Sequence, residues 1–326
     1  MKQSTSLRYT LIRTILIVSM LLLNACSNNP PPPLRIASSP WPGYEPLYLA
    51  RDLGYLREEK VDLFELPSAD VTMESFRNHS TDMATLTLDE TLELLHDGTK
   101  LRILLILDES TGGDAVMVDQ SIKTLSDIKG KRIAIVNIPL GLYMLNRLLD
   151  KANILRQDVT VFPMADTHQE SFYRQGKADV VITYEPTKTR LSNLGMKVIF
   201  DSSDIPGEIF DLLVVHEDTY LQRKDDICEV AQQWFRTLDY MNKNPDDAAK
   251  RISMRLGVTA DEFINMGKGI EQTSRTTNQN MLSGTNPAIL LSASRLNQIM
   301  QLEGQLSREI DPLLAIDKNF SHCYSK

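Results

Sequence analysis

Cysteine is scarce in this 326-residue sequence, and the clustered ligands of metal sites are missing from it. The three cysteines are Cys26, Cys228 and Cys323, with no Cys-x-x-Cys pair and no histidine pair beside them. Zinc and iron–sulfur sites need such clusters, so we expect no metal. The five histidines are also scattered, which favours surface or capping positions over catalysis.

The motifs that carry common enzyme chemistry are absent as well. No Gly-x-Gly-x-x-Gly follows a predicted strand, and neither Gly-x-x-x-x-Gly-Lys-Ser/Thr, His-Glu-x-x-His nor Gly-x-Ser-x-Gly occurs. The sequence therefore lacks the residues that dinucleotide, nucleotide, zinc-protease and serine-hydrolase sites require. We expect a protein that is not an enzyme and that needs no cofactor.

Positive charge is the other deficit. The net charge is -8, and no dense run of Lys or Arg follows the first fifteen residues. A phosphate backbone would be repelled on average, so we expect no nucleic-acid partner. With 42% hydrophobic and 24% charged residues, the chain is long and apolar enough for two domains or lobes, and we expect a monomer.

The first residues are typical of a bacterial export signal. Lys2, Arg8 and Arg13 precede an apolar run over residues 14–23 that is too short for a stable membrane span. The run ends in Leu23-Asn24-Ala25-Cys26, which resembles a lipobox. We expect residues 1–25 to be a lipoprotein signal peptide and Cys26 to be lipidated; an unmodified cysteine after an ordinary signal peptide is the alternative.

Residues 26–33 contain four consecutive prolines, Pro30 to Pro33. Consecutive prolines favour extended polyproline II, so this segment is predicted to be a stiff tether between the lipid and the folded part. With Cys26 lipidated in an oxidising compartment, Cys228 and Cys323 could form a disulfide, or they could remain free thiols.

Beyond residue 34, short β-like runs alternate with amphipathic helical stretches, which favours an α/β fold with mostly parallel sheets. Residues 34–113 are predicted to form the first part of lobe 1, and residues 114–210 to form lobe 2. Residues 211–326 turn strongly helical and are predicted to return to lobe 1. The two crossovers, near Gly112 and Asp211, would then form a two-strand hinge.

Three segments carry a family resemblance. The first is residues 36–56, with its core Trp-x-Gly-Tyr-x-Pro-Leu-x-Leu-Ala; the second is Leu125 to Ala134; and the third is Gly176 to Pro186. In this order they resemble the SsuA/THI5 (NMT1-like) family of periplasmic substrate-binding proteins. The resemblance implies a type II periplasmic binding fold, in which two α/β lobes joined by a two-strand hinge close on a small molecule and deliver it to an ABC permease. Known members carry nitrate, alkanesulfonates, taurine or thiamine-precursor pyrimidines.

The loops after the strands of such a fold form its ligand crevice, because the carboxyl ends of strands meet there. The residues that we expect in the site are Trp41, Tyr44, Thr87, Asp89, Asp114, Pro139, Gly141, Tyr184, Glu185 and Asp211. Trp41 would offer an aromatic face to a flat or cationic ligand, unless it only packs the lobe edge. Pro139 and Gly141 would offer backbone N–H groups at a helix start, and Glu185 is the single polar contact that we favour most.

Several of these residues have a structural alternative. Asp89 could equally cap its own helix, and Asp211 could belong to the hinge. Counted by charge, the set holds four carboxylates, from Asp89, Asp114, Glu185 and Asp211, and no Lys or Arg. That balance favours an amine-bearing or neutral heterocyclic ligand, such as a pyrimidine, over a sulfonate or nitrate.

The sequence therefore predicts a lipid-anchored solute-binding protein of a bacterial periplasm, whose partners are a small-molecule ligand, an ABC permease and, through the lipid, the membrane. A ligand-sensing subunit that docks a membrane sensor kinase or cyclase is the alternative. An enzyme of the thiamine-pyrimidine kind is a third class, which the export signal disfavours.

Overall fold

The computed structural model describes residues 31–324. The predicted signal peptide, Cys26 and the tether up to Pro30 lie outside the described residues. Residues from Leu34 onward form one compact unit. Among residues 31–324, no helix is long and apolar enough to cross a membrane.

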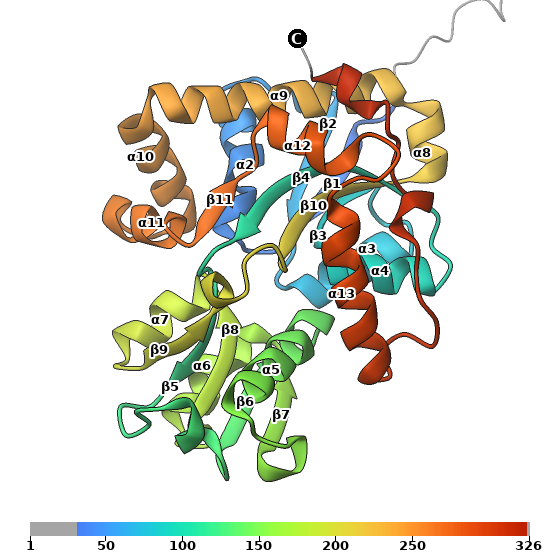
Figure 1. Cartoon of the computed structure of the whole chain (residues 1–326). Coiled ribbons are helices and arrows are strands. Elements are labelled where there is room, and N and C mark those ends of the chain that lie inside the picture. The colour runs from blue at the N-terminus through green and yellow to red at the C-terminus, as the bar shows by residue number, and fades with distance from the viewer. Residues whose placement is uncertain (1–30, 325–326) are drawn as a thin grey trace, which may run out of the picture. The chain divides into compact units, whose positions relative to one another are not determined.

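The first lobe is built on a six-stranded mixed sheet, shown in the upper half of Figure 1. In spatial order its strands are β11 (Ile270–Gln272), β4 (Leu101–Ser110), β10 (Phe210–His216), β3 (Met83–Thr87), β1 (Leu34–Ser38) and β2 (Val61–Glu65). The strands β3 and β10 are buried along their whole length, as expected of central strands covered on both faces. Pairing of β10 with β3 and with β4 is antiparallel, whereas β1 pairs with β2 and β3 in parallel.

Helices from both ends of the chain cover this sheet. They are α2 (Glu45–Asp52), α3 (Ala69–Arg77), α4 (Leu88–His96), α8 (Glu217–Gln222), α9 (Lys224–Lys243), α10 (Pro245–Leu256), α11 (Ala260–Gly267) and α12 (Arg275–Leu282). The long helix α9 packs on α2, and it buries Trp234 and Phe235 in the lobe core. The α/β character and the two-lobe organisation expected from the sequence are therefore present.

The second lobe has a five-stranded sheet in the order β7 (Thr160–Met164), β6 (Arg132–Val136), β8 (Val180–Tyr184), β5 (Asp114–Val118) and β9 (Lys197–Asp201). Its helices are α5 (Pro139–Ala152), α6 (Asp166–Arg174) and α7 (Thr187–Asn193). The alternation of residues 114–182 predicts most of these elements. It does not predict α7, which is short and polar and has no clear periodicity. It also misses β9, although the apolar run Val198 to Phe200 is typical of a strand.

Two crossovers connect the lobes, one from Ser110 to Asp114 and one from Asp201 to Phe210. Both pass through one cluster of hydroxyl groups. The Ser110 and Ser202 hydroxyls are 2.8 Å apart, and the Gly112 N–H donates to Ser202 Oγ at 2.6 Å. Gly112 has a φ of 131°, a left-handed conformation that side chains rarely adopt, so glycine is needed at this turn.

The helix α13 (Ile289–Leu302) differs from the expectation that the tail only completes lobe 1. It packs against α4 of the first lobe and also against α5 of the second (Figure 1). Arg295 on α13 lies 3.6 Å from Glu208 in the return crossover, and Glu208 also accepts from Arg147 on α5 at 2.8 Å. The tail thus contacts both lobes beside the hinge.

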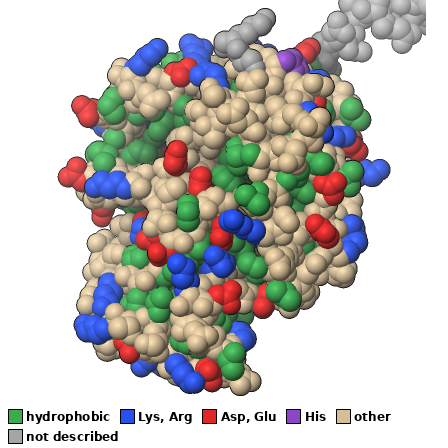
Figure 2. All heavy atoms as spheres, in the orientation of Figure 1, with side chains coloured by type: hydrophobic (Ala, Val, Ile, Leu, Met, Phe, Trp, Pro, Cys, Tyr) green, Lys and Arg blue, Asp and Glu red, His purple; other side chains and the backbone are tan. Residues whose placement is uncertain are grey.

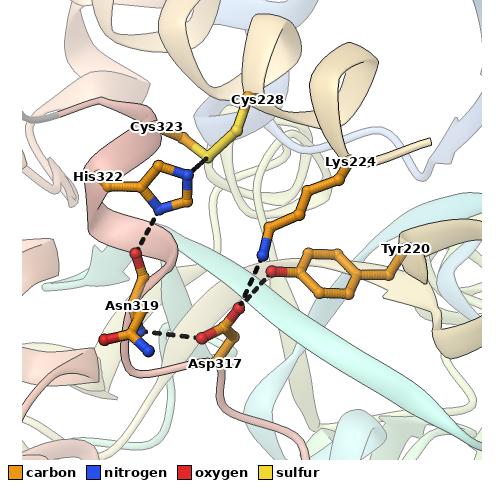
Figure 3. Close-up of a disulfide and its surroundings, with 7 residues drawn as sticks. All are labelled: Tyr220, Lys224, Cys228, Asp317, Asn319, His322 and Cys323. Carbon is orange, nitrogen blue, oxygen red and sulfur yellow. Dashed lines mark hydrogen bonds and ion pairs between the residues drawn. A yellow bond between two sulfur atoms is a disulfide. The ribbon is translucent and has the colours of Figure 1, made fainter. Parts of the chain in front are cut away.

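A disulfide joins Cys228 on α9 to Cys323 in the 3-10 helix η6 (Phe320–Cys323), 95 residues further along the chain (Figure 3). It ties the end of the described chain to the first lobe. Beside it, Asp317 accepts from Tyr220 and lies 3.7 Å from Lys224, which fastens the same segment to α8 and α9.

Candidate functional site

A small cavity lies where the two lobes meet, at the carboxyl ends of β1, β3 and β8. The space inside it that the centre of a water-sized sphere can reach is about 30 Å³, enough for about two water molecules. Its walls come from both lobes: Ser39, Trp41, Tyr44, Ala69, Thr87, Glu90, Asp114, Ile138, Leu140, Tyr184 and Asp211. Six of the ten residues expected from the sequence are therefore brought together here: Trp41, Tyr44, Thr87, Asp114, Tyr184 and Asp211.

The aromatic residues of the first loop are held by a pair of carboxyl groups. Trp41 precedes the 3-10 helix η1 (Pro42–Tyr44), which comes shortly after β1, and Tyr44 is its last residue. The Trp41 indole N–H donates to Asp108 Oδ1 at 3.2 Å, and the Tyr44 hydroxyl donates to Asp211. Asp108 and Asp211 lie opposite each other on β4 and β10, and their carboxyl groups are hydrogen-bonded.

Glu90 has a buried carboxylate oxygen that no group of the described chain pairs with. Thr87 is the N-cap of α4, and it forms a capping box with Glu90, whose Oε2 accepts from the Thr87 N–H at 2.9 Å. The other oxygen of Glu90, Oε1, has no hydrogen-bond partner, and only 2% of the residue is exposed, so water does not replace that partner. An unpaired buried carboxylate oxygen is costly, so this atom is suited to a cationic or hydrogen-bond-donating ligand.

The second lobe contributes a matched pair of residues. Asp114 at the start of β5 lies opposite Tyr184 at the end of β8, and both are buried. The ring of Tyr184 meets that of Trp41 edge to face, with centroids 6.2 Å apart. Aromatic rings from the two lobes therefore enclose the cavity together with carboxyl groups.

Burial raises the pKa of every carboxyl group around this cavity for which a shift is resolved. It raises the pKa of Asp108 to about 7 and that of Asp114 to about 8, and in Asp114 the neighbouring Asp211 and Asp89 add to the effect. For Glu90 and Asp211, burial and then the charges of Asp89 and Asp108, respectively, raise the pKa well above the ordinary value. A cation in the cavity would reverse these shifts, because it favours the charged form of each carboxyl group.

The remaining four expected residues lie elsewhere. Glu185 turns away from the cavity wall, because its Oε2 accepts from the Thr189 N–H of α7 at 3.0 Å and its Oε1 lies 3.6 Å from the Lys188 ammonium. Its carboxylate is thus occupied by the helix that it precedes. The expectation of Glu185 as the main polar ligand contact is corrected accordingly, and Lys188 is a nearby cation that the charge count from the sequence left out.

Asp89, Pro139 and Gly141 are also absent from the cavity wall. Asp89 is the first acidic residue of α4, next to Glu90, and burial raises its pKa to about 6. Pro139 lines a separate groove beside the cavity. Gly141 packs on β6, where a side-chain carbon would lie 2.1 Å from the Val136 carbonyl oxygen, so this glycine is required for packing rather than for backbone donors to a ligand.

Sequence reasoning missed five residues of the wall, namely Ser39, Ala69, Glu90, Ile138 and Leu140, and also missed Asp108 behind it. Glu90 follows the capping residue Thr87, and a capping glutamate usually points outwards, so its second oxygen gave no signal. Asp108 could have been found as the acidic residue that directly follows the apolar run 101–107. A carboxyl group at the end of a central strand is buried, and a buried carboxyl group usually has a specific partner.

Potential metal ligands gather at one other place in the described part of the chain. The Cys228, His322 and Cys323 ligand atoms lie within 4.8 Å of one another, but both sulfur atoms belong to the disulfide (Figure 3). The His322 ring nitrogens contact the Asn319 carbonyl oxygen at 2.5 Å and Cys323 Sγ at 3.6 Å. This group is on the first lobe, and none of its members lines the cavity.

The fold has two α/β lobes with a cavity between them. The model of the NMT1/THI5-like family matches residues 41–248, and the chain belongs to this family. The match begins at Trp41 and so includes the aromatic loop, both crossovers and all of lobe 2. A comparison with curated protein sequences found no match.

Solved structures share the fold at low sequence identity. The periplasmic aliphatic sulphonate binding protein SsuA from Escherichia coli is 15% identical, with a TM-score of 0.70, and the match covers 88% of this chain and 92% of that one. A ligand-binding component of an ABC-type import system from Staphylococcus aureus, with zinc bound, is 12% identical with a TM-score of 0.75, covering 90% and 98%. The desulfurization enzyme DszB is 14% identical with a TM-score of 0.67, covering 89% and 98%. Because binding proteins and an enzyme share the architecture, the fold alone does not assign the function.

Proposed function

We propose that this protein is a solute-binding protein that captures a small amine-bearing molecule between its two lobes and delivers it to an ABC importer. The observation that carries the ligand class is the unpaired Glu90 Oε1 in a cavity walled by Asp114, Asp211 and three aromatic rings. A cationic nitrogen would pair with Glu90 and meet the aromatic faces, an interaction worth about 0.5–2 kcal/mol for a desolvated cation.

The same wall disfavours anions. A sulfonate or nitrate would lie against Glu90, Asp114 and Asp211 in a cavity where no Lys or Arg is part of the described wall. An anion would hold these carboxyl groups in their neutral forms, whereas a cation stabilises their charged forms, so the wall gains an electrostatic attraction only with a cation. Heterocycles that carry an amine, pyrimidines among them, satisfy both the aromatic and the acidic parts of the wall.

The size of the cavity supports capture by hinge closure. A space of about 30 Å³ admits little more than two water molecules, so a larger ligand enters only when the lobes separate at the two crossovers. Each lobe then supplies part of the contacts: Trp41, Tyr44 and Glu90 come from the first, and Asp114 and Tyr184 come from the second. The full set forms only in the closed state.

A screen against matched pairs of compounds tests the ligand class. The purified protein is denatured to release any bound small molecule for mass spectrometry, and thermal unfolding is followed with n-butylamine, n-butanol, 5-(aminomethyl)pyrimidine, 5-(hydroxymethyl)pyrimidine, taurine and nitrate. We expect at least one amine to raise the melting temperature by several degrees more than its alcohol. A shift with taurine or nitrate alone would overturn the assignment.

The partners follow from the same assignment. We place the protein on the periplasmic side of a bacterial membrane, held through a lipid on Cys26, as a monomer that docks an ABC permease. Metabolic labelling with an alkyne fatty acid should mark the wild type and leave Cys26→Ser unmarked. Labelling of both proteins, or of neither, would remove the anchor from the proposal.

A further inference from the structure

The Asp108–Asp211 pair lies beneath the aromatic loop, on the two strands that lead to the crossovers. Asp108 is 0% exposed and Asp211 is 3% exposed. Asp108 is two residues before the end of β4, and Asp211 is the second residue of β10. The pair is therefore next to both the hinge and the cavity. Asp211 lines the cavity, and Asp108 lies behind its wall.

Each member of the pair holds one aromatic residue of the site. Asp108 accepts from the Trp41 indole N–H at 3.2 and 3.4 Å, and Asp211 accepts from the Tyr44 hydroxyl. The space around Asp108 is tight, because a side-chain carbon on Gly43 would lie 2.2 Å from Asp108 Oδ2. The glycine allows the loop to rest directly on the carboxyl group.

The hydrogen bond between the two carboxyl groups requires a proton. Two carboxylates have only acceptors, so one of the pair must carry an O–H that donates to the other. The structure therefore holds a proton in the wall of the cavity, shared between Asp108 and Asp211. The two residues lie opposite each other on paired strands and are both buried, and the raised pKa of both groups agrees with a shared proton.

The groups that face the pair are mostly acidic. Asp114 comes from β5, while Asp89 and Glu90 come from α4, and all three are buried carboxyl groups. Tyr44 and Trp41 face it from the η1 loop as donors, and Gln272 lies opposite Asp108 on β11. Lys188 on α7 acts on Asp114. A cation that enters the cavity adds the positive charge that this cluster lacks.

We propose that Asp108 is a specificity-determining positioning residue, which couples the binding of a cation to the release of the proton that it shares with Asp211. In this step a ligand ammonium group enters the cavity, the O–H bond of the carboxyl pair breaks, and the proton leaves to solvent. No electrons are transferred. A neutral isostere brings no charge and leaves the proton in place, so the coupling favours amines over alcohols of the same shape. This inference rests on the proposed binding of an amine.

The test is the number of protons released on binding. Calorimetric titrations with n-butylamine and with 5-(aminomethyl)pyrimidine, each run in buffers of different ionisation enthalpy at about pH 7, give that number. Asp108→Asn keeps the acceptor for Trp41 and a donor for Asp211, but it cannot ionise. We expect it to release about one proton fewer than the wild type. Asp211→Asn should show the same deficit, and the double variant should lose no further proton, because the pair shares one.

The pH profile gives a second readout that a merely structural role would not change. The wild-type affinity for the amine should rise with pH by up to about tenfold per unit below the pKa of the pair, and the profile of Asp108→Asn should be flatter. Asp119→Asn, a half-buried carboxyl after β5 that does not line the cavity, is the matched control and should follow the wild type.

The outcomes separate the two proposals. Amine binding by the wild type with no proton released, or with the same release in Asp108→Asn, would overturn the coupling and leave the proposed function standing. If neither amine binds the wild type, the proposed ligand class fails and the coupling fails with it. Thermal unfolding of each variant confirms that a lost response comes from a folded protein.

Discussion

Asp114 and Tyr184 lie directly opposite each other on antiparallel strands β5 and β8, so that one residue pair gives the second lobe both an acid and an aromatic ring at the cavity. The first lobe repeats this combination with Glu90 and Asp211 beside Trp41 and Tyr44. Acid and aromatic groups from both sides therefore converge on one small space.

Glu90 should decide the preference for a charged ligand. Glu90→Gln keeps the oxygen that caps α4 but removes the negative charge, so we expect the affinity for n-butylamine to fall by about tenfold or more, with little change for n-butanol. Titration calorimetry measures both. Glu93→Gln, on the same helix but outside the cavity wall, should bind the amine as the wild type does; an equal loss in both variants would indicate a general effect on α4.

Trp41 and Glu185 should behave differently, although the sequence places both in the site. Trp41→Phe removes the N–H that donates to Asp108 and shortens the aromatic wall, so we expect amine affinity to fall about fivefold to fiftyfold. Glu185→Gln changes a carboxylate that faces Thr189 and Lys188, so binding should stay within about threefold of the wild type. A larger loss in Glu185→Gln than in Trp41→Phe would contradict the placement of the cavity.

The stability of the ligand-free protein should depend on Asp114 and on pH. Its pKa is about 8 in the folded protein, above the ordinary value, so the folded state keeps a proton that the unfolded chain releases. The stabilisation linked to this proton is complete below about pH 4 and is lost as the pH rises towards 8. Asp114→Asn should therefore raise the free energy of unfolding at pH 8 by about 1 kcal/mol or more, and by less at pH 5. Urea unfolding at both pH values measures this, and an effect independent of pH would contradict it.

The disulfide should matter for stability and not for binding. The disulfide between Cys228 and Cys323 closes a long loop of the chain, and such a crosslink stabilises the folded protein by roughly 2–5 kcal/mol. Replacing both by serine should lower the urea midpoint but leave amine affinity unchanged, since neither residue lines the cavity. A protein of unaltered stability would show that the pair is not joined in solution.

Much of this architecture could be predicted from local patterns. Apolar runs such as Leu101 to Leu107 are typical of central strands, and the Thr-x-x-Glu pattern of Thr259 and Glu262 is a capping box that marks the start of α11. Elements such as α7 and the three-residue β11 could not be predicted, because their stability comes from neighbours in the fold and not from their own periodicity.

The site was predictable where residues lie at the ends of strands or at the crossovers. Trp41, Thr87 and Tyr184 are found by the first rule, because the carboxyl end of a strand points into the crevice, and Asp114 and Asp211 are found at the crossovers. The sequence does not show that Glu90 Oε1 is left without a partner once Oε2 caps α4. Nor does it show that β4 pairs with β10 and so places Asp108 opposite Asp211. Both features depend on the tertiary structure. The surface offers little further guidance: on the face in Figure 2, side chains of both signs are mixed over the two lobes.

The most direct test of the central claim compares two ligands that differ in charge and little in shape. The wild-type protein is titrated by calorimetry at pH 7 with 5-(aminomethyl)pyrimidine and with 5-(hydroxymethyl)pyrimidine, beside n-butylamine and n-butanol. A cavity walled by Glu90, Asp114 and Asp211 predicts that the cation of at least one pair binds about tenfold or more tightly than its alcohol. Equal affinities within both pairs, or tighter binding of taurine or nitrate than of either amine, would contradict the account.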